Sequence, residues 1–366
     1  MRDATLVTTP EQLDAAVFRL QGSRRFAIDT EFMRESTYFP QLCLLQVASD
    51  ADCYLVDPLA GLDLAPLFAT LADRAKAKIL HAARQDIEVM LNAGGHVPGP
   101  VFDTQVAAGL LGMPPQVGYA ELVARQLGHS IDKAQTRTDW SRRPLSDAQL
   151  AYAADDVHHL LQLHTDLAAA LEAHGRAQWQ AEECAALEDP RLYRTEPSEA
   201  WRRLKGLSRM RPGEQAVARA VAGWREQRAI ASDKPRGWIL TDEALYAIAT
   251  LAPATTAELE QVRSLPPAVV RKRGDELLEL VRTARESSAG AAPSPAPQRP
   301  TPEQTRRIGQ LQQRVRDVAA ALGINPEVLA TRRDVEGMVL GSPDDSALLR
   351  GWRREVIGNA LLELLA

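Results

Sequence analysis

The N-terminal third of the chain alternates short apolar runs with amphipathic segments. Three apolar runs separated by polar turns predict an antiparallel meander of strands over 24–32, 42–49 and 53–57. Further along, the periodicity predicts a helix over 62–72, a strand over 77–81, a helix over 84–95 and a strand over 101–104. We therefore expect a mixed α/β sheet flanked by helices in this part of the chain.

Beyond Tyr119 the pattern becomes mostly helical. A long stretch of apolar periodicity runs from Ser146 to about residue 187, and it begins with SDAQ, in which Ser146 can cap a helix. A break over 188–200 precedes an Arg-rich helical segment, which in turn leads to a stretch rich in Ala, Pro and Ser that predicts a semi-extended linker. The expected organisation is a mixed-sheet domain over 1–190, a helical domain over 200–285, a linker over 286–302 and a second helical domain over 303–366.

The charge is distributed unevenly along the 366 residues. Residues 1–199 carry 17 Lys and Arg against 28 Asp and Glu, a net charge of −11. Residues 200–285 carry 16 against 10, a net charge of +6. An acidic half suits cation binding and a basic segment suits phosphates. A solvated basic surface is an equal alternative on charge alone.

Hydropathy and cysteine usage indicate the compartment. No apolar run approaches the ~20 residues that a membrane-spanning helix needs, and the start, MRDATLVTTPEQL, lacks the apolar core of a signal peptide. We expect no membrane association and a cytoplasmic location. Cys43, Cys53 and Cys184 show no C-x-x-C spacing, so we expect buried reduced thiols rather than disulfides or zinc ligands.

Acidic residues stand at three places where a sheet protein could bring them together. Asp29 and Glu31 alternate on one strand, so both carboxylates share a face. Asp86 opens a helix that follows a strand, which places it at the carboxyl end of that strand. Each position alone also has an ordinary explanation, such as a solvated strand or a stabilised helix dipole.

The third place is the segment QLAYAADDV, which lies inside the long helical stretch. Tyr152 and Asp156 are spaced i, i+4 and therefore share a helix face, while Asp155 competes with Asp156 on spacing alone. Oxygen ligands of this kind suit Mg²⁺ or Mn²⁺. Acids from three elements are what a two-metal phosphodiesterase requires, with two ions that clamp the scissile phosphate.

Three motifs resemble those of the DEDD superfamily of 3′→5′ exonucleases. They are AIDTEF (27–32), HAARQDIEVM (81–90) and YAADDV (152–157), and the Y-x-x-x-D spacing is typical of the tyrosine subclass. The stretch over 131–157 is more similar still to the ribonuclease D family. So is the order of parts, with an Arg-rich segment at about 201–285 that resembles an HRDC domain and a weaker resemblance over 303–366.

This resemblance implies a ribonuclease H-like exonuclease domain followed by all-α HRDC-like domains. Asp29, Glu31, Asp86 and Asp156 would bind two Mg²⁺ or Mn²⁺ ions, and Tyr152 would hold the attacking water. The family match thereby favours Asp156 over Asp155. The activity would be 3′→5′ exoribonuclease, releasing nucleoside 5′-monophosphates from RNA, with tRNA precursors that carry 3′ extensions as the family's usual substrate. We expect a monomer.

Several other residues have a structural and a functional interpretation. We expect Asp103 to cap a helix rather than catalyse, and His81 to end a strand with its hydrogen bonds satisfied. Phe32 could stack on a terminal base or pack in the core. The basic residues before the third motif could contact phosphates or form surface ion pairs, and we weigh these equally: Lys133, Arg137, Arg142 and Arg143.

The basic residues of the middle segment are candidates for RNA binding, although HRDC-like domains also bind proteins. They form two groups: Arg202, Arg203, Lys205, Arg209 and Arg211, then Arg271, Lys272 and Arg273. Two alternatives to the exoribonuclease remain. A DNA 3′→5′ exonuclease would use the same acids, and a non-catalytic RNA-binding module would have lost one of them, which this chain has not.

Overall fold

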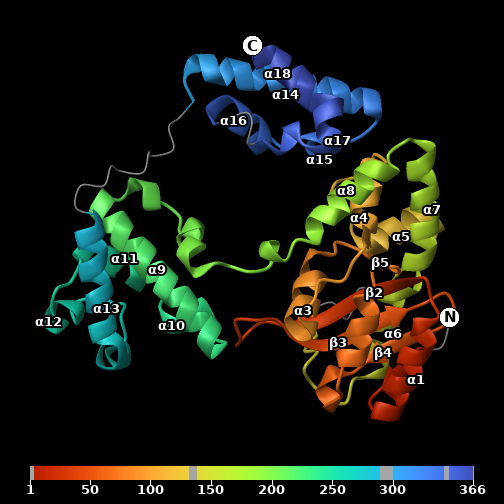
Figure 1. Ribbon diagram of the computed structural model, residues 1–366, viewed down its shortest axis with the longest axis horizontal. Coiled ribbons are helices and arrows are strands. Elements are labelled where there is room, and N and C mark those ends of the chain that lie inside the picture. Colours follow the sequence, from red (N-terminus) through yellow and green to blue (C-terminus); the bar gives the residue numbers. More distant parts are fainter. Residues whose placement is uncertain (1–3, 132–137, 289–299, 342–345, 366) are drawn as a thin grey trace. The chain divides into compact units, whose positions relative to one another are not determined.

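The computed structural model describes residues 4–131, 138–288, 300–341 and 346–365. These residues form two compact units (Figure 1). The first contains residues 1–33, 41–190 and 300–366, and the second contains 34–40 and 191–299. The helices of 303–366 thus group with the N-terminal part of the chain. The boundaries of 303–366 as a domain of its own stay a prediction.

A six-stranded mixed sheet is the centre of the first unit. Its strands lie in the order β1–β4–β3–β2–β5–β6. Strands β2, β3 and β4 are antiparallel neighbours, while β1 pairs with β4, β5 with β2 and β6 with β5 in parallel. The expected meander extended by parallel strands is therefore confirmed. The bounds are β1 Thr5–Val7, β2 Arg25–Met33, β3 Gln41–Ala48, β4 Cys53–Val56, β5 Ala77–Leu80 and β6 Val101–Asp103.

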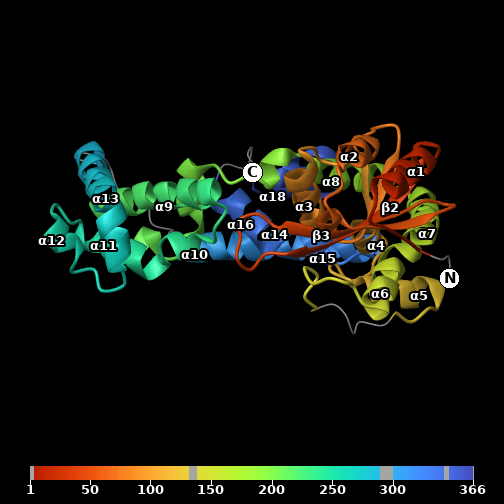
Figure 2. The ribbon, with the colours of Figure 1, turned by 90° about the horizontal axis from the view of Figure 1, so that it is seen from below.

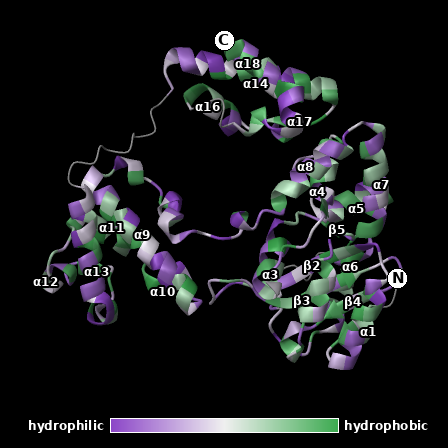
Figure 3. Cartoon of the chain, in the orientation of Figure 1, coloured by the Kyte–Doolittle hydropathy of each residue, from purple (hydrophilic) through white to green (hydrophobic). Residues whose placement is uncertain are grey.

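Helices cover both faces of this sheet. Figure 2 shows α6 on one side of β3 and helices α1 to α3 on the other. The strands are strongly apolar, which Figure 3 shows for β3 and β4. The helices of this part are α1 Pro10–Gln21, α2 Ala65–Leu71, α3 Arg84–Gly94, α4 Thr104–Leu110, α5 Tyr119–Leu127, α6 Asp147–His158, α7 Leu160–Ala173 and α8 Ala177–Leu187.

The long helical stretch is divided into three helices. It begins as expected, because the Ser146 hydroxyl accepts from the Gln149 backbone N–H in a capping box. A break at His159 separates α6 from α7, and Gly175, with φ of +66°, ends the turn before α8. Helix α6, which ends at this break, lies against the sheet and contacts β2, β3 and β4.

The C-terminal helices pack into the first unit through one shared apolar core. The Trp352 indole stacks on Trp179 of α8 with ring centroids 4.4 Å apart. The Arg176 guanidinium joins the two parts, because it donates to the carbonyls of Leu110 and Leu322. The helices are α14 Pro302–Leu322, α15 Pro326–Leu329, α16 Arg332–Leu340, α17 Gly351–Arg353 and α18 Asn359–Leu365.

The second unit is a helical bundle with a core of its own. Its helices are α9 Pro212–Ser232, α10 Arg236–Ile239, α11 Asp242–Leu251, α12 Thr256–Leu259 and α13 Pro267–Ser288. Helix α9 is the central element, since it packs against both α11 and α13. The expected helical region after the sheet domain is thereby confirmed.

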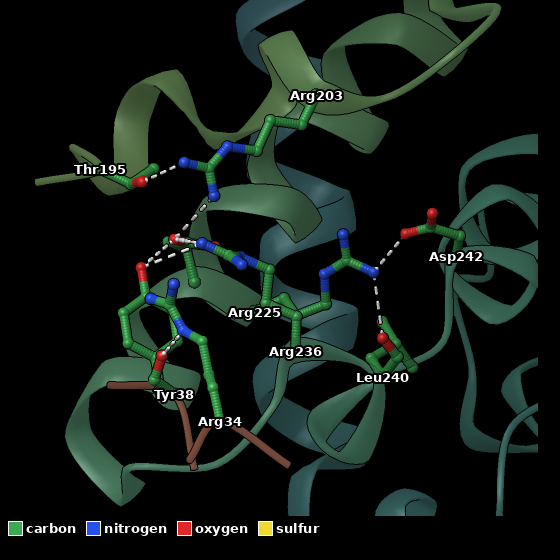
Figure 4. Close-up of polar contacts among 9 residues, drawn as sticks. Arg34, Tyr38, Thr195, Arg203, Arg225, Arg236, Leu240 and Asp242 are labelled. Atoms are coloured by element: carbon green, nitrogen blue, oxygen red, sulfur yellow. Dashed lines mark hydrogen bonds and ion pairs between the residues drawn. The ribbon is translucent and has the colours of Figure 1, made fainter. Parts of the chain in front are cut away.

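The connection between β2 and β3, residues 34–40, is built into this second unit. Within the unit, the Tyr38 hydroxyl donates to the buried Glu226 carboxylate, which also accepts from Arg236 (Figure 4). The Asp233 carboxylate accepts from the backbone N–H groups of Tyr38 and Phe39, both at 3.0 Å. Residues 34–40, which follow β2, are therefore anchored by specific polar contacts.

Candidate active site

Three carboxylates converge on one face of the sheet. Asp29 and Glu31 alternate on β2 and share a face, and α6 crosses that face carrying Asp156. One oxygen from each of the three carboxylates lies within 4.8 Å of the others. Residues far apart in sequence therefore form a single acidic cluster, which the spacing of the motifs had led us to expect.

Asp86 lies beside this cluster at the start of α3. Its carboxylate is buried and accepts a hydrogen bond from the Thr30 hydroxyl at 2.6 Å. Thr30 stands between Asp29 and Glu31 on β2, so Asp86 is fixed to the same strand. Its oxygens are not part of the three-carboxylate group, yet its charge is close enough to raise the pKa of Asp29.

Burial and mutual repulsion keep these acids from ionising readily. Burial first, and then the charges of Asp86, Asp156 and Glu31, raise the pKa of Asp29 well above its usual range. Burial and the charge of Asp156 raise the pKa of Glu31 to about 8. Burial likewise raises the pKa of Asp86 to about 7, although the bond from Thr30 opposes the shift.

Tyr152 and Asp156 lie together on α6 as their spacing predicted. Burial raises the pKa of Asp156 to about 7, while a hydrogen bond with Tyr152 lowers it and the neighbouring Asp155 raises it. Asp155 is not in the three-carboxylate group, and its backbone carbonyl accepts from the Tyr119 hydroxyl at 3.0 Å. The structure therefore places Asp156, and not Asp155, in the cluster.

The donor set fits a divalent cation. Carboxylate oxygens alone, without thiolate or imidazole, are the ligands that Mg²⁺ and Mn²⁺ prefer. The raised pKa values show that Asp29, Glu31 and Asp156 are costly to ionise without a counter-charge. A bound cation would supply that charge, and these three residues could hold it, with Asp86 beside them.

Two residues with open interpretations have structural roles. The Asp103 carboxylate caps α4 by accepting from Gln105 N at 2.8 Å, and it also accepts from the backbone N–H groups of Ala82 and Ala83. The His81 ring pairs with the Thr104 hydroxyl and the carbonyl of residue 117. Both expectations, a helix cap and a satisfied strand-end histidine, are confirmed.

The basic residues before the third motif do not behave alike. Arg143 forms an ion pair with Asp57, because its guanidinium donates to both carboxylate oxygens of Asp57 at 2.6 and 2.7 Å. It also donates to the carbonyl of Cys43. Arg142 is exposed and lies 3.9 Å from Asp139. Lys133 and Arg137 lie outside the described residues. Phosphate binding by Arg143 is therefore disfavoured.

Thr30 and Tyr119 are site neighbours that the sequence did not indicate. Thr30 is the middle residue of the D-x-E motif, which the alternation of a strand directs to the opposite face from Asp29. Tyr119 is half-buried, and burial together with the charge of Asp156 raises its pKa well above the usual range. Only the three-dimensional course of α3 and α6 brings these hydroxyls to the acids.

The remaining sequence expectations concern thiols and membranes. All three cysteines are free and buried, as expected. In the part of the chain that the structure describes, we find no helix with both the length and the apolar character to cross a bilayer. Phe32, next to Glu31, is half-buried, which leaves both of its interpretations open.

Two family models match the chain. Residues 4–172 match a 3′-5′ exonuclease model, and residues 214–281 match an HRDC domain model. The first match includes all five residues singled out from the motifs. The second falls within the helical bundle of the second unit.

Relatives and a solved structure match over almost the whole chain. The chain is 41% identical over 368 residues to ribonuclease D of Gluconacetobacter diazotrophicus, covering 99% of this chain and 93% of that protein. It is 41% identical over 371 residues to ribonuclease D of Acidiphilium cryptum, with the same coverage. The crystal structure of Escherichia coli RNase D matches with a TM-score of 0.89 at 32% identity, covering 99% of this chain and 98% of that one.

Proposed function

The chain belongs to the ribonuclease D family of 3′→5′ exoribonucleases, and from this premise we propose that it removes nucleotides one at a time from RNA 3′ ends with the help of two divalent metal ions. The observation that carries the proposal is the acidic cluster of Asp29, Glu31 and Asp156 on one face of the sheet. Asp86, bonded to the strand that carries the first two acids, completes the set.

The four acids and Tyr152 have different roles in the proposed reaction. Asp29, Glu31, Asp86 and Asp156 would hold the ions, Mg²⁺ or Mn²⁺. When bound, the ions supply positive charge at the scissile phosphate and lower the pKa of the attacking water. Tyr152, hydrogen-bonded with Asp156, would hold that water in line with the phosphorus atom.

The bond changes are those of phosphodiester hydrolysis. The water oxygen bonds to the phosphorus of the last linkage, and the bond from phosphorus to the 3′ oxygen of the preceding nucleotide breaks. The terminal nucleotide leaves as a nucleoside 5′-monophosphate, and the shortened chain keeps a free 3′ hydroxyl. The three clustered carboxylates are half-buried, so they lie partly out of water, and this strengthens the electrostatic contacts that they make.

The substrate we propose is a tRNA precursor with a 3′ extension. Phe32 is half-buried beside Glu31, so its ring is available to stack on the terminal base. A DNA 3′→5′ exonuclease is the second candidate because it would use the same acids. A dead nuclease that only binds RNA ranks last, since all the acids are present and three of them are already grouped.

The central experiment compares a tRNA with a 3′ extension and a matched single-stranded DNA in the presence of Mg²⁺. We expect the wild type to shorten the RNA to mononucleotides and Asp156→Ala to abolish that activity. Asp155→Ala is the matched control, because this neighbouring acid is not in the carboxylate group, and it should keep activity. Equal or faster degradation of DNA would contradict the RNA assignment, and full activity of Asp156→Ala would contradict the site.

The second unit is the proposed RNA-binding module. Several of its arginines are engaged in ion pairs, such as Arg202 with Glu199 and Arg211 with Glu214. Arg271 and Lys272 of α13 are exposed and remain the better candidates for phosphate contacts. Replacing both with Ala should weaken RNA affinity and flatten its salt dependence, and an unchanged slope would contradict this role.

We propose that the protein acts as a monomer, which its mass in solution would test.

A further inference from the structure

Gln46 stands next to the acidic cluster on the neighbouring strand. In the register of the sheet it is directly opposite Asp29 of β2 on one side and Leu55 of β4 on the other. Directly opposed residues share a face of the sheet. Helix α6 covers this face, since it contacts β2, β3 and β4, and Leu55 belongs to the same apolar cluster as Ala153 of α6. Gln46 therefore lies in the layer between the sheet and α6, beside Asp29.

The carboxamide of Gln46 is buried without a hydrogen bond. The residue is 0% exposed, and neither Nε2 nor Oε1 has a partner among the residues that the structure describes. Other buried glutamines are satisfied: Gln180 donates to the Cys184 sulfur and Gln215 to the Met210 carbonyl. A buried amide with both polar atoms unpaired lowers stability, so its presence calls for another explanation.

We propose that Gln46 is a positioning residue of the metal centre: when a divalent cation is bound, its Nε2–H would donate to the Asp29 carboxylate and orient it toward the cation. The inference rests on the proposed function, because it assumes that Asp29 is a ligand. Cβ atoms of directly opposed residues lie about 4.5–5.5 Å apart, which a glutamine side chain can span. A ligating carboxylate uses one lone pair on the cation and is fixed by a donor to another.

The alternative is that Gln46 merely fills space between the sheet and α6. The two roles predict different effects of Gln46→Leu, which replaces the side chain by one of similar size without polar atoms. If Gln46 only fills space, Gln46→Leu changes neither cation binding nor the site. If it positions Asp29, the same variant keeps its fold and loses cation affinity.

The experiment measures Mn²⁺ binding to the full chain by calorimetry without RNA, and the unfolding temperature in EDTA. For Gln46→Leu we expect an unfolding temperature equal to or above that of the wild type, because two unpaired buried polar atoms are removed. We expect the Kd for Mn²⁺ to rise at least about 10-fold, the lower end of what loss of an outer-shell partner costs. Gln215→Leu is the matched control, and it should lower the unfolding temperature and leave the Kd unchanged.

Two results would overturn the proposal. One is an unchanged Mn²⁺ Kd in Gln46→Leu, and the other is a loss of folding as large as that of Gln215→Leu, which would show that the carboxamide supports the fold. The wild type and Asp29→Asn separate this failure from that of the proposed function. If the wild type binds no Mn²⁺ and Asp29→Asn behaves identically, the metal centre itself is refuted. If only the Gln46 variant is unaffected, the positioning role alone is refuted.

Discussion

At the scale of single residues, the carboxyl groups of the cluster and of the adjacent Asp86 have raised pKa values, which favour the binding of a cation. Burial raises the pKa of Glu31 to about 8 and those of Asp86 and Asp156 to about 7. Near neutral pH these groups therefore keep a share of their protons when no cation is present. A cation that binds must displace those protons, which couples metal affinity to pH.

The first prediction concerns stability against pH in EDTA. A carboxyl with a raised pKa keeps its proton in the folded state after the unfolded state has lost it, so stability falls as pH rises across that interval. For Glu31 the interval runs from its ordinary value of 4.5 to about 8. We expect the unfolding temperature in EDTA to decrease as the pH rises from 4.5 to about 8. We expect Mn²⁺ to remove most of this decrease. A metal-free protein whose unfolding temperature rises across this interval would contradict the prediction.

The second prediction concerns Asp29→Asn. This change replaces a carboxyl group that burial and neighbouring acids disfavour in its charged form by a neutral amide, so the metal-free variant should unfold a few degrees higher than the wild type in EDTA. Its exonuclease activity should fall by more than about 100-fold, because loss of an outer partner of a metal already costs about 10–100-fold. Thermal unfolding and a gel assay on RNA check the two effects. An active Asp29→Asn would contradict the ligand role.

Some residues of this site could be predicted from the sequence and others could not. Alternation on a strand was enough to put Asp29 and Glu31 on one face, since that follows from backbone geometry alone. The choice between Asp156 and Asp155 was not accessible from spacing, because both lie within reach on a helix. The path of α6 across the sheet decides it. Gln46 had one signal that was overlooked, namely a long polar residue within the otherwise apolar run 42–48 of β3.

At the scale of elements, the expected strands of the sheet were confirmed, including the short β5 and β6, but two elements at the start of the chain were missed. The strands β2 to β4 were expected to within about two residues at each end, as is normal for element boundaries. Strand β1 and helix α1 were not expected. The strand has only three residues, Thr5–Val7, and depends on its parallel pairing with β4, which no local pattern reveals. The helix did carry a local signal, a capping box formed by Thr9 and Gln12.

The connection between β2 and β3 is a second element that tertiary contacts define. Its anchor is Glu226, whose side chain is 1% exposed. Burial opposes ionisation of Glu226, but hydrogen bonds from Arg236 and Tyr38 outweigh it and hold its pKa below the usual value. The Glu226 carboxylate is therefore charged near neutral pH. The hydrogen bonds from Tyr38 and Arg236 stabilise this buried charge (Figure 4).

The third prediction compares two substitutions at this anchor. Tyr38→Phe removes one donor to a charged group and should cost about 1.5–3 kcal/mol. Arg236→Met leaves the buried Glu226 charge without its main partner and should cost more, about 3–5 kcal/mol. Urea unfolding checks the order of the two. A smaller loss for Arg236→Met than for Tyr38→Phe would show that Arg203, 4.0 Å from Glu226, can replace it.

At the scale of the whole molecule, the first unit is assembled from distant parts of the chain. Residues 300–366 complete its core, with Trp352 stacked on Trp179 and its indole N–H donating to Glu183 at 2.8 Å. The sequence showed these helices to be amphipathic, but an amphipathic face does not state which surface covers it. Only the long-range contacts identify that surface.

The fourth prediction tests this assembly. Trp352→Ala should lower the stability of the first unit by about 3–5 kcal/mol, the usual cost of truncating a buried large aromatic. Trp238→Ala is the matched control, because Trp238 is 64% exposed and should change stability little. Thermal unfolding of the full chain measures both. Equal effects of the two substitutions would argue against a shared core.

The divided first unit has a consequence for synthesis. Residues 1–190 leave the ribosome before residues 300–366, but the core that they help to form also contains side chains from those later helices. The second unit, which contains 191–299, emerges complete before those helices do. During synthesis the core of the first unit therefore stays incomplete until residues 300–366 have been made, and Trp179 lacks its stacking partner Trp352 until then.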